Sequence, residues 1–129
     1  MAGIYIHIPF CKQACTYCDF HFSTTYEAYR KEMIDCIIQE IVSRKSSFSD
    51  QKITTIYFGG GTPSLLLENE LRAIITTIFK HYNVCENPEI TLEANPDDIN
   101  MKALQIWKNN NINRLSIGVQ SFDNEDLAW

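Results

Sequence analysis

IYIHIPFCKQACTYC occupies residues 4–18 of this 129-residue chain. Isoleucine at every second position alternates with Tyr5 and His7, which is the two-residue period of a β-strand with two different faces. Pro9 ends the strand, and three cysteines follow within eight residues. This stretch therefore predicts a strand that carries a cysteine loop at its carboxyl end.

Beyond this stretch the chain continues to alternate helix and strand. The apolar spacing and turn residues predict helices over 24–45, 71–82 and 101–107, and strands over 53–58, 89–94 and 114–120. Such alternation requires parallel strands with right-handed helical crossovers, as in an open sheet or a barrel. Polar residues share one face of the strands, among them Thr91 and Glu93. A barrel whose lumen is lined by these polar faces is therefore favoured over an open sheet. We expect an α/β fold, the N-terminal half of a partial (β/α) TIM-like barrel with about four parallel strands.

The composition excludes several classes of protein. With 45% hydrophobic and 21% charged residues, the chain is expected to form one soluble globular unit. A net charge of −5 disfavours nucleic acid as a partner, because Lys and Arg supply most of the affinity for phosphates. The sequence contains neither a leader peptide nor about 18 consecutive apolar residues, so we expect a cytoplasmic protein without a membrane span. Residues 123–129 resemble the start of another helix, which predicts that residues 1–129 begin a longer domain.

Cys11, Cys15 and Cys18 have the spacing C-x3-C-x2-C. Three thiolates on one short loop can hold three irons of a [4Fe–4S] cubane and leave the fourth iron open to a small molecule. The alternative is a structural zinc site in which His7 or His21 is the fourth ligand. Iron and sulfide analysis would distinguish the two.

The two remaining cysteines are expected to be inert. Cys36 lies among isoleucines on the first predicted helix, whose apolar stripe we place at Tyr29, Met33, Ile37 and Ile41, and we expect it to be buried in the core. Cys85 is expected to be a loop thiol.

Four further features suggest a ligand site at the strand ends. The glycine run Gly59–Gly61 would let the backbone approach a ligand, although an ordinary strand-to-helix turn uses the same residues. Glu93 and Gln120 could bind a ligand or could be solvated side chains. His7 could relay a proton beside a metal cluster or could be a hydrogen-bonded core histidine.

The cysteine spacing resembles the signature of the radical S-adenosylmethionine (SAM) superfamily. Together with the motifs YIHIPFC, GGGTP, LEANP and GVQSF, the chain resembles the oxygen-independent coproporphyrinogen III oxidase family and its heme-chaperone branch. The resemblance implies a radical SAM core domain in which the three loop cysteines bind a [4Fe–4S] cluster and SAM binds the open iron, where its cleavage gives a 5′-deoxyadenosyl radical. It places His7 near the cluster. The residues that it implies as SAM contacts are Tyr5, Tyr17, Gly60, Gly61, Thr62, Glu93 and Gln120.

Two departures from the oxidase pattern favour the heme-chaperone branch. The oxidase has another cysteine two residues after the third ligand, where this chain has Phe20, and an N-terminal arm for which the first strand, starting almost at Met1, leaves no room. We therefore expect a heme chaperone, with its heme-binding segment beyond Trp129. The alternative is an oxidase that decarboxylates porphyrinogen propionates in porphyrin biosynthesis; a radical SAM enzyme acting on RNA is disfavoured by the acidic charge. The implied partners are SAM, heme or a porphyrinogen, an electron donor such as a flavodoxin, and heme-acceptor proteins.

Overall fold

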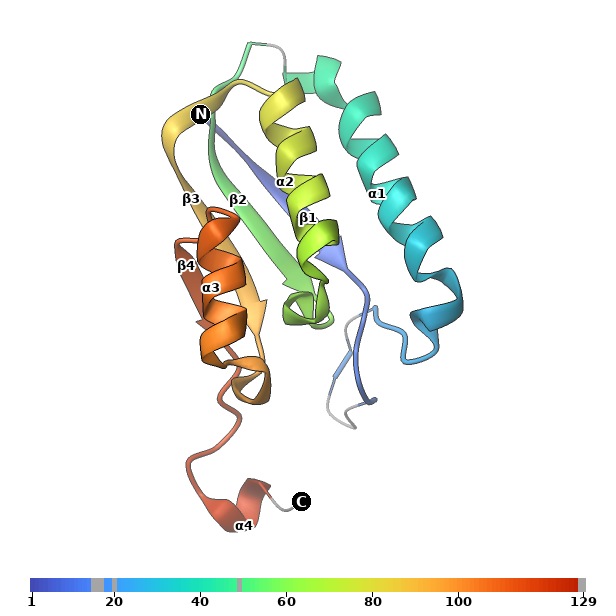
Figure 1. The fold of residues 1–129 in the computed structure, drawn as a ribbon, viewed down its shortest axis with the longest axis vertical. Helices are drawn as coiled ribbons and strands as arrows, with labels where there is room; N and C mark the ends of the chain where they lie inside the picture. Colours follow the sequence, from blue (N-terminus) through green and yellow to red (C-terminus); the bar gives the residue numbers. More distant parts are fainter. Residues whose placement is uncertain (15–17, 20, 49, 128–129) are drawn as a thin grey trace.

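The computed structural model describes residues 1–14, 18–19, 21–48 and 50–127 (Figure 1). Four parallel strands form one sheet in the order β1-β2-β3-β4. The strands are β1 (Ala2–Ile8), β2 (Ile53–Gly60), β3 (Val84–Ala94) and β4 (Arg114–Ile117), and the α-helices are α1 (Arg30–Ser43), α2 (Glu68–His81), α3 (Met101–Asn109) and α4 (Asn124–Leu127). Short 3₁₀ turns lie at Tyr26–Tyr29, Lys45–Phe48, Pro63–Leu65 and Pro96–Asp98. The structure confirms the predicted α/β fold with parallel strands and helical crossovers.

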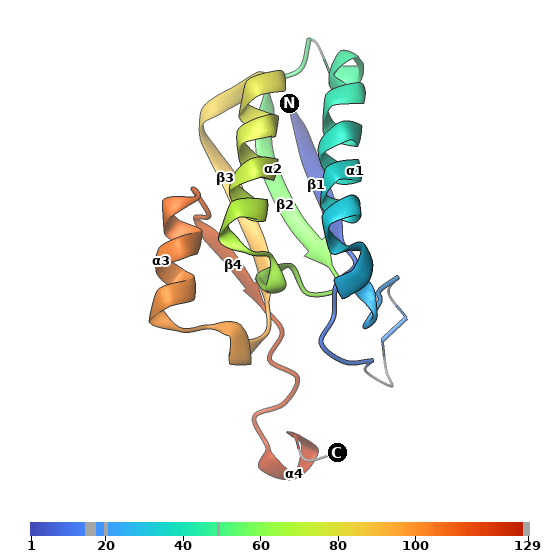
Figure 2. The same ribbon diagram turned by 45° about the vertical axis from the view of Figure 1, so that its right-hand side comes forward.

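The crossover helices α1, α2 and α3 all cover the same face of the sheet (Figures 1 and 2). Right-handed crossovers between consecutive neighbouring strands place every helix on one side, as in one wall of a (β/α) barrel. The opposite face carries polar side chains in register, because Tyr5 pairs with Tyr57 and Tyr57 with Thr91. The two faces of the sheet therefore have different roles: one packs the core and the other presents polar groups.

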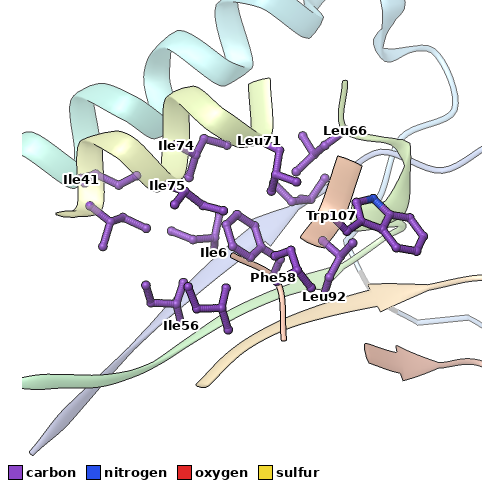
Figure 3. Close-up of a cluster of buried hydrophobic side chains, with 14 of the residues drawn as sticks. Ile6, Ile41, Ile56, Phe58, Leu66, Leu71, Ile74, Ile75, Leu92 and Trp107 are labelled. Atoms are coloured by element: carbon purple, nitrogen blue, oxygen red, sulfur yellow. The ribbon is translucent and has the colours of Figure 1, made fainter. Parts of the chain in front are cut away.

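The hydrophobic core lies between the sheet and the helices (Figure 3). Strand register aligns Ile6 with Phe58 and Phe58 with Leu92, and all three side chains are buried. Ile74 of α2 and Trp107 of α3 are buried in the same cluster. Each fully buried large apolar side chain contributes roughly 1.5–3 kcal/mol, so this layer supplies most of the stability that holds the strand ends in place.

The apolar stripe predicted for the first helix is confirmed at Ile37, which packs against the core, and at Ile41, which is buried, but it is wrong at its first two residues. The residues of α1 that are buried are Ile34 and Ile41, whereas Tyr29 and Met33 are 67% and 40% exposed. Cys36 is exposed, so the expectation that it fills the core is wrong. Residues two apart on a helix point to different sides, and a cysteine two positions after a buried isoleucine faces solvent.

The third and fourth strands also differ from the prediction. β3 begins at Val84, so Cys85 is a strand residue with a partly exposed side chain, and the expectation of a loop thiol is wrong. β4 ends at Ile117, three residues before the predicted end at Gln120. Ladder pairing with β3 stops at Ala94, opposite Ile117, and beyond that pair β4 has no strand to pair with in the described part of the sheet. No helix within the described residues is long and apolar enough to span a membrane.

A buried ion pair joins the start of α1 to the start of α2. Arg30 donates from Nε and Nη2 to the two carboxylate oxygens of Glu70, each at 2.7 Å, and from Nη2 to the Leu65 carbonyl at 2.6 Å. Glu70 also accepts from the Leu67 N–H, which caps α2. The side chains of the pair are only 12% and 10% exposed, and the guanidinium lies 4.9 Å from the ring centre of Phe10. The pair therefore ties both helices to the chain that enters the cysteine loop.

We expect Arg30→Met to lower the free energy of unfolding by about 3 kcal/mol, because it leaves the Glu70 carboxylate buried without its cation. Urea unfolding followed by circular dichroism measures the loss. The matched control is Arg72→Met, which removes an exposed pair to Glu68 at 3.9 Å and should change stability by less than about 1 kcal/mol. Equal losses in the two variants would show that the Arg30 pair is not buried as described.

Candidate functional site

The cysteine loop and the glycine run meet at the carboxyl ends of β1 and β2. Gly61 donates its N–H to the Ile8 carbonyl at 2.7 Å, and Thr62 donates its N–H to the Phe10 carbonyl at 2.6 Å. These bonds extend the parallel pairing of β1 and β2 past the ends of both strands. The Thr62 hydroxyl lies 3.5 Å from the Cys11 sulfur, toward which it donates. Cys11 is thereby placed directly beside the glycine run.

Two of the three glycines are required by this close approach. A β-carbon added at Gly61 would lie 2.7 Å from the Phe10 carbonyl and 3.0 Å from the Cys11 sulfur. Gly60 has φ of 113°, a conformation that favours glycine, and a β-carbon there would lie 2.7 Å from the His7 ring. The glycine run therefore brings backbone groups against the cysteine loop and His7, where side chains would not fit.

Glu93 occupies the polar face at the end of β3 and is bound by its own chain. Its Oε1 accepts from the Tyr57 hydroxyl at 2.6 Å, and its Oε2 accepts from the Gly60 N–H at 3.2 Å. Tyr57 in turn stacks on Tyr5, with ring centres 6.0 Å apart and planes 20° apart. The predicted ligand residues Glu93, Gly60 and Tyr5 are thus brought into one cluster, with Tyr57 between them.

Glu93 also influences the ionisation of both tyrosines. The hydrogen bond to the Glu93 carboxylate, with a smaller contribution from burial, raises the pKa of Tyr57 above its usual value. Burial, with a smaller contribution from the Glu93 charge, raises the pKa of Tyr5. Both phenols therefore remain protonated donors at neutral pH, and the Tyr57 hydroxyl can hold the carboxylate in one orientation.

His7 is hydrogen-bonded through both ring nitrogens. Nε2 lies 2.9 Å from the His21 carbonyl, which can only accept, so Nε2 carries a proton. Nδ1 lies 3.3 Å from the Tyr5 hydroxyl, which donates to it when the imidazole is neutral. The structure thus links the strand residue His7 to the cysteine loop at His21. This arrangement is compatible with a hydrogen-bonded structural histidine and with a proton relay.

The structure describes only part of the predicted ligand set. Cys11 and Cys18 are partly buried and are not joined in a disulfide, whereas Cys15 and Tyr17 lie outside the described residues. Within the described residues, no three His, Cys, Asp or Glu side chains are grouped as a metal site. Gln120 is exposed and donates to the Gly118 carbonyl at 3.2 Å, so the described structure does not join it to the Glu93 cluster.

Four contacting residues at this site were not predicted from the sequence. Tyr57 could have been found, because it alternates with Gly59 on the polar face of β2. The other three form a contact between three loops: Lys12, Ser64 and Asp98. The first and last of them are 86 residues apart in the sequence, so no local sequence pattern predicts that they meet.

Comparison with known proteins identifies the family. The model of the radical SAM superfamily matches residues 5–129. The chain belongs to the radical SAM superfamily. Membership implies a [4Fe–4S] cluster and SAM as cofactors, in agreement with the sequence analysis. The predicted family resemblance is likewise confirmed by individual relatives.

The relatives include both branches of the predicted family. The chain is 40% identical over 127 residues to the heme chaperone HemW of Buchnera aphidicola, covering 97% of this chain and 33% of that protein. It is 31% identical over 124 residues to the oxygen-independent coproporphyrinogen III oxidase of Salmonella typhimurium, covering 95% and 27%. The structure of coproporphyrinogen III oxidase (HemN) from Escherichia coli superposes with a TM-score of 0.86 at 30% identity, covering 95% and 29%. The chain thus spans about a third of the length of the relatives it matches.

The described residues fit the cofactors of this superfamily. The Cys11 side chain is partly buried, at a position where Gly61 leaves no side chain between the sulfur and the backbone. The glycine run and the Glu93 carboxylate lie on the same edge of the sheet, where the carboxylate oxygens can accept further hydrogen bonds from a polar ligand such as SAM. The site therefore combines a cysteine sulfur, an atom type that binds iron–sulfur clusters, with a carboxylate that can bind an amino or hydroxyl group.

We expect Glu93→Gln to lower the pKa of Tyr57, because an amide acceptor no longer favours the neutral phenol as a carboxylate does. The pKa of Tyr57 is measured by alkaline titration of the tyrosinate absorbance. The Tyr57→Phe variant identifies the part of the signal that belongs to this residue. In the wild type, the raised pKa means that the stability contributed by Tyr57 is complete below about pH 10. It is lost as the pH rises through the folded-state pKa. A Tyr57 titration unaffected by Glu93→Gln would contradict the hydrogen bond.

Proposed function

We propose that Cys11, Cys15 and Cys18 hold a [4Fe–4S] cluster and that SAM binds beside it. The observation that supports this most strongly is the hydrogen-bonded junction of the glycine run with the Cys11 segment, which places the Cys11 sulfur beside the backbone of Gly61 and the hydroxyl of Thr62. When bound, the cluster and SAM supply an electron donor and a reducible sulfonium. The protein contributes position and shielding, as it does in other cofactor proteins.

The SAM site is proposed on the polar face of the sheet. The Glu93 carboxylate is oriented by Tyr57 and can accept from an amino or hydroxyl group, and the absence of side chains at Gly60 and Gly61 lets a polar ligand approach the backbone closely. His7 can hold or release a proton at Nε2, which now donates to the His21 carbonyl. Further contacts are proposed from the sequence, at Tyr5, Tyr17, Thr62 and Gln120.

For the protein that contains this chain, we propose a heme chaperone that retains this radical SAM core and works in the reducing cytoplasm. The support is the higher identity to the heme chaperone, 40% against 31% for the oxidase, together with Phe20 in place of the additional cysteine of the oxidase. Heme, heme-acceptor proteins and an electron donor such as a flavodoxin are the proposed partners. The alternative is coproporphyrinogen decarboxylation, which the similarity to both oxidases supports.

We expect reconstituted protein to bind about four irons per chain. Cys15→Ala and Cys18→Ala should each reduce iron and sulfide to a small fraction of this content, because each removes one of three thiolate ligands. The iron and sulfide content of each variant is measured after anaerobic reconstitution. Cys36→Ala is the matched control, since that thiol is exposed on α1 and should leave the iron content unchanged. Full iron content in Cys15→Ala would show that the ligand assignment is wrong.

We expect the intact protein to bind heme and to leave coproporphyrinogen III unchanged. Heme binding is measured by titration of the Soret band, and decarboxylation by an anaerobic assay with reductant and SAM, followed by chromatography. Phe20→Cys is an informative variant, because it restores the residue type of the oxidase without altering the three proposed cluster ligands. Robust formation of protoporphyrinogen without heme binding would overturn the chaperone proposal in favour of the oxidase.

A further inference from the structure

Three loops that follow consecutive strands meet at one buried carboxylate. Asp98 ends the 3₁₀ turn Pro96–Asp98 after β3, and its side chain is only 7% exposed. Its Oδ1 accepts from the ammonium of Lys12, which lies in the cysteine loop after β1. Its Oδ2 accepts from the hydroxyl of Ser64, in the 3₁₀ turn after β2, at 2.6 Å. One carboxylate therefore crosslinks the loops of three neighbouring strands.

This contact differs from an ordinary surface ion pair. Exposed pairs contribute little, because water screens both charges. Here the Lys12 side chain is 58% exposed, but the Asp98 side chain is almost fully shielded and needs both donors to compensate for lost hydration. Removing Lys12 leaves a buried carboxylate with one donor fewer.

The contact also extends the bonding of the cysteine loop beyond its base. Backbone hydrogen bonds close the loop at its base, where Cys11 donates to Ser23 and Ser23 donates to Pro9. Lys12 is the next residue after Cys11, and its partner lies two strands away across the carboxyl edge of the sheet. The base of the loop is thus bonded to segments that follow β1 and β2, whereas Lys12 is bonded to the loop that follows β3.

We propose that Lys12, Asp98 and Ser64 form a latch that positions the cysteine loop over the carboxyl edge of the sheet. Asp98 is the centre of the latch and acts through Lys12 on the neighbouring Cys11. These are positioning residues, because neither Lys12 nor Asp98 is among the proposed ligands. The structural part of this inference stands on the contacts alone, and its consequence for the iron cluster rests on the proposed function.

Hydrogen exchange of the iron-free intact protein tests the latch without any cofactor. Lys12→Met and Asp98→Ala should each accelerate backbone exchange over residues 11–25 by about fivefold, the upper range for an ion pair that is partly exposed. Because both variants break the same contact, the double variant should exchange no faster than Asp98→Ala. Lys12→Arg, which keeps the charge, should stay within about twofold of the wild type. Multiplicative effects in the double variant, or no effect in either single variant, would overturn the latch.

Arg44→Met is the matched control, because it breaks an exposed 2.7 Å ion pair to Glu40 at the far end of α1 and should leave loop exchange unchanged. Iron release from reconstituted protein to a chelator gives the second readout. We expect it to be about fivefold faster in Lys12→Met, in proportion to the loop exchange. Absence of iron in the wild type would reject the proposed function while the exchange data still judge the latch. Equal iron release with altered exchange would show that the latch does not position the ligands.

Discussion

The site depends on two backbone hydrogen bonds that join the end of β1 to the end of β2. The Gly61 N–H binds the Ile8 carbonyl and the Thr62 N–H binds the Phe10 carbonyl, so the segments that follow β1 and β2 stay in contact after the strands have ended. Only glycine permits this approach at Gly61, since a β-carbon would clash with the Phe10 carbonyl. The position of Cys11 relative to the glycine run follows directly from these bonds.

The hydrophobic layer makes that junction rigid. Buried side chains such as Phe58 and Leu92 hold the strands in register, and register decides which residues share the polar face. A shift by one residue would turn Glu93 into the core and Leu92 toward the site. Core packing on one face therefore determines the orientation of the polar groups on the other.

Electrostatic contacts set the remaining positions at the strand ends. Glu70 binds Arg30, whose guanidinium lies over the Phe10 ring. Glu93 binds Tyr57, and Asp98 binds Lys12 and Ser64. Each acidic side chain is partly or largely shielded and is satisfied by donors from another element. The acidic net charge of the chain thus includes carboxylates that organise the site as well as solvated ones.

The sequence by itself determined the α/β class, the order of strands and helices, and the family. The evidence for these was the hydrophobic periodicity, the cysteine spacing and the glycine run. Each involves residues that are close together in the chain, so it can be recognised without the tertiary structure. It also identified Gly60 and Glu93, which the structure brings together, although their roles toward SAM stay predictions. Two predictions from the sequence were wrong: that Cys36 is in the core and that β4 extends to Gln120. The residues near Cys36 do not specify which face of the helix packs on the sheet, and those near Gln120 do not specify where the pairing of β4 with β3 ends.

Only the tertiary structure decided that Tyr57 orients Glu93, that His7 contacts the His21 carbonyl, and that Asp98 joins Lys12 to Ser64. These contacts link residues far apart in the chain. They arise because the carboxyl ends of parallel strands lie at one edge of the sheet, where side chains from successive loops meet. Their pairing depends on register and loop geometry, which are fixed only when the core packs.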